Sequence, residues 1–200
     1  NLDLKEYLPF LACGIIAWTF ILTFINEGAS AIINSGHIIK QISMPVLTHI
    51  MRVAFRNTLI FLHSWIILIP LLMWYGYLTW FGLLCSILGI ALVVFTLTPF
   101  ATLLAVICAR YRDVLPMVAS ALQLLFFVTP VMWHPSQLAG LSEVIRYNPF
   151  VYFIDLIREP MLNGVLPAAS AGLVFAMGVV LWIAALATLF INRKHIPYWI

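Results

Sequence analysis

Long apolar stretches without charged residues set the pattern of this chain. A helix needs about 20 such residues to cross the hydrocarbon core of a bilayer. Residues 57–109 contain no Asp, Glu, Lys or Arg, which is too long a stretch for one crossing. The aromatic cluster at 74–77 is typical of a membrane–water interface and divides this stretch into two helices. The whole pattern predicts five membrane-spanning helices, at about 8–33, 57–77, 80–108, 114–134 and 167–191.

The segment between the fourth and fifth predicted spans is apolar but too short to cross the membrane twice. Its apolar residues recur at the spacing of one helix face, at Phe150, Phe153, Ile154 and Ile157. This spacing predicts one or two short helices within 141–163, which re-enter the membrane from the outside or lie at its interface. A plain amphipathic linker is the alternative.

Composition agrees with a membrane protein. The 200 residues are 64% hydrophobic and only 8% charged, whereas soluble domains carry about 25% charged residues. A soluble core of this chain length cannot hide so much apolar surface. We therefore expect an all-α, polytopic helix bundle that forms a single transmembrane domain over residues 1–200.

The distribution of charge predicts the orientation of the chain. Three segments on one side, 35–56, 109–113 and the stretch after 191, hold seven of the ten basic residues and one acid, Asp113. Cytoplasmic loops carry such an excess of Lys and Arg, so the C-terminus should be cytoplasmic and Asn1 outside. An outside start without a signal-peptide pattern predicts a further helix ahead of Asn1, and thus six spans in the intact subunit.

The connection at 34–56 contains a short amphipathic segment, with apolar residues at Ile38, Ile39, Ile42 and Leu47 and a breaker at Pro45. Such a helix can dock into a groove on a partner protein. It can equally lie on lipid headgroups, and the pattern alone leaves both open.

Several kinds of chemistry are missing from the sequence. No G-x-x-x-x-G-K-[ST] loop is present, so this chain cannot bind ATP in the P-loop manner. His37 and His49 are twelve residues apart and the three cysteines show no CxxC spacing, so no metal site is expected. The net charge of +3 is too small to suggest nucleic acid. We expect no enzyme site and no cofactor in this chain.

Five patches in order along the chain carry a family resemblance. They are Glu27-Gly28; Asn34 with Ile39-Lys40 and Pro45; Tyr111-Arg112-Asp113; Leu122-Gln123 through Phe126-Phe127 and Thr129-Pro130-Val131 to Tyr147-Asn148-Pro149; and Ile191 to Trp199. Together they resemble the membrane permease subunits of type-2 ABC exporters, specifically those that export O-antigen, capsule and teichoic acid polymers. The resemblance runs over essentially the whole chain.

This resemblance implies a homodimer in the bacterial inner membrane, with two copies of a separate ATPase that carries the ATP and Mg²⁺. The substrate would be a polysaccharide linked to undecaprenyl diphosphate, which the permease would export across this membrane. Membrane lipids would surround the permease. Two rival interpretations stay open. One is a membrane-embedded transferase that acts on lipid-linked sugar, and the other is a type-2 exporter of a small lipid or drug.

The resemblance also suggests roles for individual residues. The expected contacts with the ATPase are Lys40, Gln41, Met44 and Pro45, and the expected outer gate is Tyr147, Asn148, Pro149 and Tyr152. A diphosphate needs cationic donors, and a carboxylate at membrane depth marks a functional site, so Glu27, Arg52, Arg56 and Arg112 are assigned to the cytoplasmic mouth. Aromatic rings offer large apolar faces on which sugars can stack, which assigns Trp18, Phe24, Phe126, Phe127 and Trp133 to the translocation path.

Overall fold

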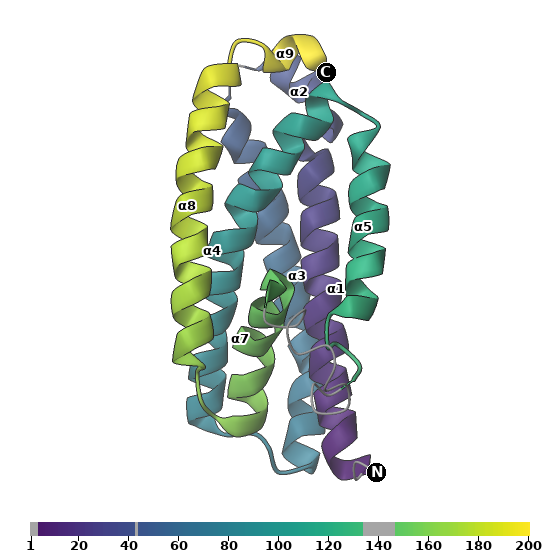
Figure 1. The fold of residues 1–200 in the computed structure, drawn as a ribbon, viewed down its shortest axis with the longest axis vertical. Coiled ribbons are helices and arrows are strands. Elements are labelled where there is room, and N and C mark those ends of the chain that lie inside the picture. Colours follow the sequence, from purple (N-terminus) through teal and green to yellow (C-terminus); the bar gives the residue numbers. More distant parts are fainter. Residues whose placement is uncertain (1–3, 43, 134–146) are drawn as a thin grey trace.

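The computed structural model describes residues 4–42, 44–133 and 147–200, which form an elongated helix bundle (Figure 1). The elements are α1 (Leu4–Asn34), α2 (Gly36–Gln41), α3 (Val46–Trp74), α4 (Trp80–Arg110), α5 (Val114–Val128), α7 (Pro149–Asn163), α8 (Ala168–Asn192) and α9 (Ile196–Trp199). The described residues contain no strand. The predicted all-α bundle is confirmed.

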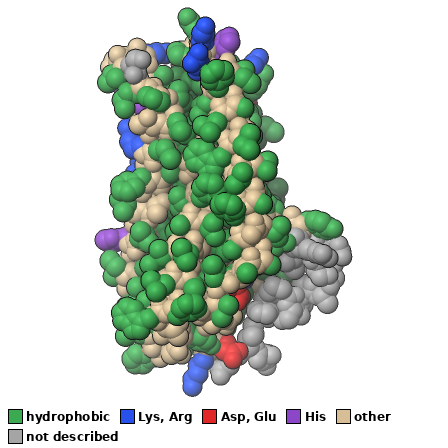
Figure 2. All heavy atoms as spheres, turned by 90° about the vertical axis from the view of Figure 1, so that its left-hand side faces the viewer, with side chains coloured by type: hydrophobic (Ala, Val, Ile, Leu, Met, Phe, Trp, Pro, Cys, Tyr) green, Lys and Arg blue, Asp and Glu red, His purple; other side chains and the backbone are tan. Residues whose placement is uncertain are grey.

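Four of these helices are long and apolar enough to cross a membrane, namely α1, α3, α4 and α8. Figure 2 shows hydrophobic side chains over most of the lateral surface, with Lys and Arg gathered towards one end. We call this end, where α2 and α9 lie in Figure 1, the basic end. The long apolar helices and the apolar lateral surface are those of a multi-pass membrane protein.

The fourth predicted span, 114–134, is shorter than expected. Its helix, α5, has 15 residues, or about 22 Å of rise, against a hydrocarbon core of about 30 Å. The helix ends because Thr129 precedes Pro130, and a residue before proline is driven to extended backbone; Thr129 has φ −89° and ψ 135°. The last residue of this predicted span and positions 141–146 of the predicted re-entrant segment lie outside the described residues.

The predicted loop at 34–56 is likewise shorter than expected. Helix α3 begins at Val46, so residues 46–56 are its first three turns rather than a loop. Pro45 stands at the N-cap position with extended backbone, where its missing N–H costs no helical bond. The hydropathy pattern had placed the start of the span after the charged residues Arg52 and Arg56, although nothing in their backbone interrupts a helix.

Helix α7 packs inside the bundle against α1, α4 and α8. It begins near mid-height and runs towards the end where the N-terminus lies (Figure 1). Two small residues of α4 permit close packing: a Cβ at Gly89 would clash with the Leu156 carbonyl, and Ser86 donates to the Ile157 carbonyl at 3.1 Å. The segment that sequence left open as a linker is therefore a packed helix.

Candidate functional site: a polar groove between α1 and α3

A polar groove runs between α1 and α3. It consists of two adjoining pockets of about 200 Å³ and about 410 Å³, which share Glu27. The smaller is lined by Ile16, Thr19, Phe20, Thr23, Glu27, Asn57, Ile60, Phe61 and Ser64, and the larger by Glu27, Ala31, Asn34, Ser35, Arg52, Val53 and Arg56. Residues three or four apart share a helix face, which aligns Thr19, Thr23 and Glu27 on α1.

Glu27 is the centre of this groove. Its Oε2 accepts hydrogen bonds from the Arg56 guanidinium and from the Asn57 side-chain amide, both at 2.6 Å. Asn57 is buried and also donates to the Val53 carbonyl at 3.1 Å. The Arg56 and Glu27 side chains are 58% and 42% exposed, so the groove is open beside them. A carboxylate at this depth is thus satisfied by paired donors, as membrane interiors require.

The larger pocket lies nearer the basic end and carries a second arginine. Arg52 donates to the Ser35 hydroxyl at 3.2 Å, and the Asn34 side chain donates to the Ser30 hydroxyl at 3.0 Å. Two guanidinium groups against one carboxylate leave a net positive charge in the pocket. Guanidinium presents several donors in one plane, which suits carboxylate and phosphate oxygens. The arrangement can therefore bind an anion.

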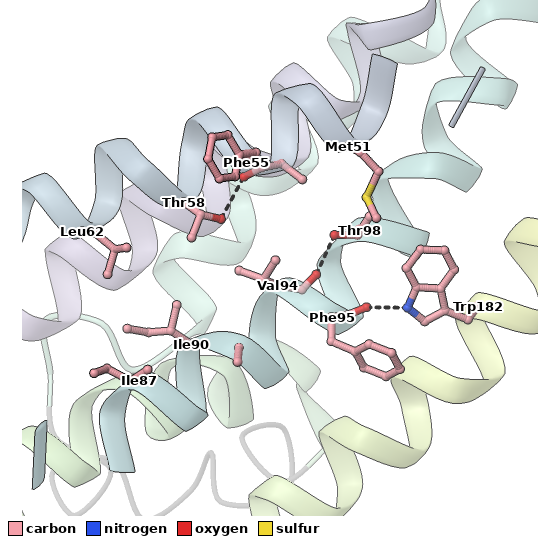
Figure 3. A pocket seen from close by; sticks show the side chains of 12 residues that line it. Met51, Phe55, Thr58, Leu62, Ile87, Ile90, Val94, Phe95, Thr98 and Trp182 are labelled. Atoms are coloured by element: carbon pink, nitrogen blue, oxygen red, sulfur yellow. Dashed lines mark hydrogen bonds between the residues drawn. The ribbon is translucent and has the colours of Figure 1, made fainter. Parts of the chain in front are cut away.

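A second groove lies on another face of α3 and has the opposite character. This apolar groove, of about 650 Å³, is lined by Met51, Ala54, Phe55, Thr58, Leu62, Ile87, Ile90, Ala91, Val94, Phe95, Thr98 and Trp182. Its polar atoms bond to backbone carbonyls: Thr58 to Ala54 at 2.8 Å, Thr98 to Val94 at 2.7 Å and the Trp182 ring N–H to Phe95 at 3.0 Å (Figure 3). The described lining of this groove has no charged or amide side chain, and its hydroxyls and ring N–H use their donors within the protein.

The Trp182 ring N–H bonds a backbone carbonyl of α4 that has no donor within its own helix. Pro99 lies inside this helix and has no N–H, so it cannot bond the carbonyl four residues earlier, which belongs to Phe95. The Trp182 ring N–H supplies the missing donor. A side chain of α8 thereby replaces the missing backbone hydrogen bond of α4, at residues that line the apolar groove.

Comparison with known proteins identifies the family. The family model described as "ABC-2 type transporter" matches residues 2–162. The chain belongs to the ABC-2 type transporter family. It is similar to the O-antigen export system permease protein RfbA of Myxococcus xanthus, with 26% identity over 197 residues, covering 96% of this chain and 75% of that protein. A Klebsiella pneumoniae protein of the same name is 26% identical over 192 residues, covering 94% and 73% respectively.

Family membership makes this chain the transmembrane, permease subunit of an ABC-2 transporter, a class that works with an ATP-binding subunit. The resemblance found in the sequence is confirmed. The structure brings three of the four residues assigned to the mouth into one pocket: Glu27, Arg52 and Arg56. Arg112 lies in the turn after α4, is exposed, and does not line this pocket.

The aromatic residues assigned to a path lie in different surroundings. Trp18 and Phe24 of the permease are core side chains, 4% and 1% exposed. Trp18 packs against Phe126, with ring centroids 5.7 Å apart, because its face of α1 points into the bundle. Neither ring lines the polar groove. Phe127 is exposed, whereas Phe126 and Trp133 are half-buried.

Sequence reasoning missed the aromatic residues that do line the polar groove. Phe20 and Phe61 stack at its smaller pocket with ring centroids 4.5 Å apart. It also missed Asn57, which lies within an apolar stretch. A signal for the groove was available in the four-residue spacing of Thr19, Thr23 and Glu27 on α1.

The residues assigned to ATPase contact are all exposed: Lys40, Gln41, Met44 and Pro45. They lie at the end of α2 and in the connection to α3, at the basic end of the bundle. They are accessible to a partner protein.

The residues assigned to an outer gate divide into two groups. Tyr147, Pro149 and Tyr152 line a pocket of about 350 Å³ together with Leu173, Val174 and Met177 of α8. Asn148 is buried instead. It caps α7 by accepting from the Phe150 amide at 3.0 Å, and it donates to the Thr129 hydroxyl at 2.9 Å.

A buried arginine was also missed. Arg158 of α7 is 3% exposed; it donates to the Pro130 carbonyl at 3.0 Å and to Asp155 at 3.2 Å. Its guanidinium also lies 4.0 Å from the centre of the Phe10 ring. Burial raises the pKa of Asp155, and Arg158 offsets part of that rise. Arg158 thus fastens α7 to α1 and to the segment after α5.

Proposed function

We propose that this permease exports a polysaccharide linked to undecaprenyl diphosphate across the bacterial inner membrane, driven by ATP hydrolysis on a separate subunit. The observation that carries the proposal is the polar groove, in which Arg52, Arg56 and Glu27 line one open pocket near the basic end. The similar proteins from Myxococcus and Klebsiella are named O-antigen export permeases, which supports the substrate class.

The chemistry of the groove fits a diphosphate attached to a glycan. Arg52 and Arg56 provide cationic donors for phosphate oxygens. Glu27 holds Arg56 in place through a 2.6 Å contact, and more than half of the Arg56 side chain stays exposed. The smaller pocket adds the hydroxyls of Thr19, Thr23 and Ser64. Hydroxyl groups are suited to contact with sugars that pass beyond the headgroup site.

The proposed assembly is a homodimer with the polymer pathway between two copies, and with two copies of the ATP-binding subunit at the basic end. That end would face the cytoplasm, together with the C-terminus, in agreement with the excess of Lys and Arg there. Lys40, Gln41, Met44 and Pro45 are exposed at this end and would contact the ATP-binding subunit. Binding and hydrolysis of ATP would shift the permease between two conformations by contacting them differently.

The outer part of the path is proposed around α7. Tyr147, Pro149 and Tyr152 would form the gate there, with Asn148 as the cap that orients their helix. Phe126, Phe127 and Trp133 remain candidates for contact with the glycan. Arg112 remains a candidate for headgroup contact in a conformation that brings the α4–α5 turn towards the groove.

The test is ATP hydrolysis by the permease and its ATP-binding subunit in lipid nanodiscs, with and without lipid-linked glycan. The variants are Arg52→Gln and Arg56→Gln, and the control is Phe55→Leu, which changes the neighbouring apolar groove. Hydrogen bonds to charged groups contribute about 1.5–3 kcal/mol, so each arginine variant should lose glycan stimulation about tenfold or more. Basal hydrolysis and the control should resemble the wild type.

Three outcomes would overturn the proposal. If no ATP-binding subunit forms a complex, the exporter interpretation fails. If the isolated permease turns over lipid-linked sugar, the transferase interpretation replaces it. If hydrolysis responds to a small lipid or drug and ignores the glycan, the substrate class is wrong.

A further inference from the structure

The six-residue helix α2 cannot hold its own position. A helix this short is unstable in isolation, because nucleation costs more than a few hydrogen bonds return. Its N-cap residue, Ser35, makes no capping side-chain bond. Most of α2 is exposed or half-buried, and only Gly36 is buried. Helix α2 continues α1 after the single residue Ser35, whose hydroxyl accepts from Arg52 of α3. The rest of its positioning comes from the elements packed against it.

A hydrophobic cluster separate from the main core lies beside α2 at the basic end. It joins buried residues of α1, α3, α4 and α9, and Ile39 of α2 packs against it. Ile196 of α9 is 0% exposed at its centre. Helix α9 also contacts α2, and a Cβ at Gly36 would lie 3.4 Å from the side chain of Ile200, the residue that follows α9. Figure 1 shows α2 and α9 next to each other at this end.

The other side of α9 is fastened to α4. The guanidinium of Arg110, the last residue of α4, lies 5.5 Å from the centre of the Trp199 ring. The His195 ring stacks on Trp199 with centroids 6.2 Å apart and planes 17° apart. Cation–π contacts of this kind hold a ring in place over a charge. An unbroken set of contacts thus leads from α2 through α9 to the end of α4.

We propose that Ile196 and Trp199 are positioning residues through which α9 holds α2 in place. When the ATP-binding subunit displaces α2, α9 would pass that movement on to α4. The positioning follows from the contacts above. The transmission rests on the proposed function, in which α2 meets that subunit. Short helix α2 alone could tilt without moving the bundle, whereas α2 packed on α9 must carry α4 with it.

The first experiment measures hydrogen exchange of the amides of residues 36–42 in the permease alone, in nanodiscs. The variants are Ile196→Ala and Trp199→Ala, and the control is Tyr198→Ala, whose side chain is 87% exposed on the same helix. Exchange should rise about tenfold or more in the first two, because losing the packing of the buried Ile196 or of the half-buried Trp199 lowers the free energy of local opening. Exchange equal to the control would overturn the positioning. If Ile196→Ala yields little folded protein, Ile196→Val should show a smaller rise of the same kind.

The second experiment measures export per ATP hydrolysed in the complex. Ile196→Ala and Trp199→Ala should keep binding and basal hydrolysis but lose several-fold in export per ATP, and Trp199→Phe should restore much of it because the ring still meets Arg110. Faster exchange with unchanged export per ATP would overturn the transmission. If the wild type binds no ATP-binding subunit, the proposed function and the transmission both fail, while the exchange data still decide whether α9 positions α2.

Discussion

Two grooves share helix α3 as a wall, yet they differ in every respect that matters for a ligand. Consecutive residues separate them: Arg56 and Asn57 belong to the polar groove, whereas Phe55 and Thr58 line the apolar groove. In the polar groove a carboxylate, a guanidinium and an amide meet at an open surface. The described lining of the apolar groove has no charged or amide side chain, so its surface is almost entirely hydrocarbon.

The comparison shows that one membrane helix can carry a polar groove on one face and an apolar groove on another. A hydropathy average over the length of α3 hides the difference between its two faces, because residues of both faces fall in the same window. The difference shows when residues are sorted by the 3.6-residue period of the helix. In such a protein, the face of the helix on which a residue lies therefore says more about its function than the composition of the whole helix.

The largest predicted effect comes from placing a new carboxylate on each side of α3. Leu62→Asp, in the apolar groove, should lower stability by about 2.5–3.5 kcal/mol, the range for Asp at the centre of a membrane helix. Ile60→Asp, two residues earlier in the polar groove, should stay within about 0.5 kcal/mol, as at an exposed site. The measurement is the yield of folded protein and the unfolding free energy in one detergent.

These two variants control for each other, because both lie near the middle of α3 and introduce the same side chain. Equal losses would show that the polar groove is as closed to water as the lipid-facing surface. The contrast between the grooves would then be one of composition only.

A smaller effect is predicted inside the polar groove. Glu27→Ala removes the acceptor of both Arg56 and Asn57. Asn57 is buried and would keep only its bond to the Val53 carbonyl, and one buried N–H left unsatisfied costs about 1–3 kcal/mol. Arg56 is more than half exposed, and such ion pairs contribute about 0–1 kcal/mol. Double-mutant cycles should thus give a larger coupling for Glu27 with Asn57 than with Arg56.

The reverse order of couplings would contradict the structure. It would mean that Arg56 is desolvated and that the groove is closed at Glu27. Glu27→Gln is the matched control, since its amide oxygen still accepts from Asn57 while the charge is gone.

The sequence predicted the class of fold and much of the polar groove, for identifiable reasons. Runs of apolar residues marked α1, α3, α4 and α8, because a hydrocarbon core demands long apolar helices. The charged residues Glu27, Arg52 and Arg56 stood out because charge is rare in such helices.

What the sequence did not reveal depends on packing. The ends of α3 and α5 were misplaced, since hydropathy follows charge and length while the helices follow Pro45 and Pro130. Trp18 and Phe24 were assigned to a path because aromatic residues suit sugars, but only the tertiary arrangement decides which face of α1 is inside. Arg158 and Asn57 were overlooked because each also bonds to a distant residue, Pro130 and Glu27, which lie 28 and 30 residues away in the sequence.

A third prediction concerns the wall of the apolar groove. Trp182→Phe removes the donor to the Phe95 carbonyl and should cost about 0.5–1.5 kcal/mol in unfolding free energy. In a Pro99→Ala background the amide of residue 99 can bond this carbonyl, so the same substitution should cost less. The smaller ring is common to both backgrounds, and the difference therefore isolates the hydrogen bond. Equal costs would show that Trp182 contributes through packing alone.

The smallest predicted effect separates the grooves by function rather than stability. Thr58→Val and Thr23→Val each remove a hydroxyl that donates to its own helix, so both should change stability within about 0.5 kcal/mol. Only Thr23 lines the polar groove. Losing one hydrogen bond to a passing glycan, about 0.5–1 kcal/mol, should slow export by about twofold to fivefold in Thr23→Val alone. An equal effect of Thr58→Val on glycan transport in nanodiscs would place the polymer on both sides of α3, which the lack of charged and amide side chains in the described lining of the apolar groove argues against.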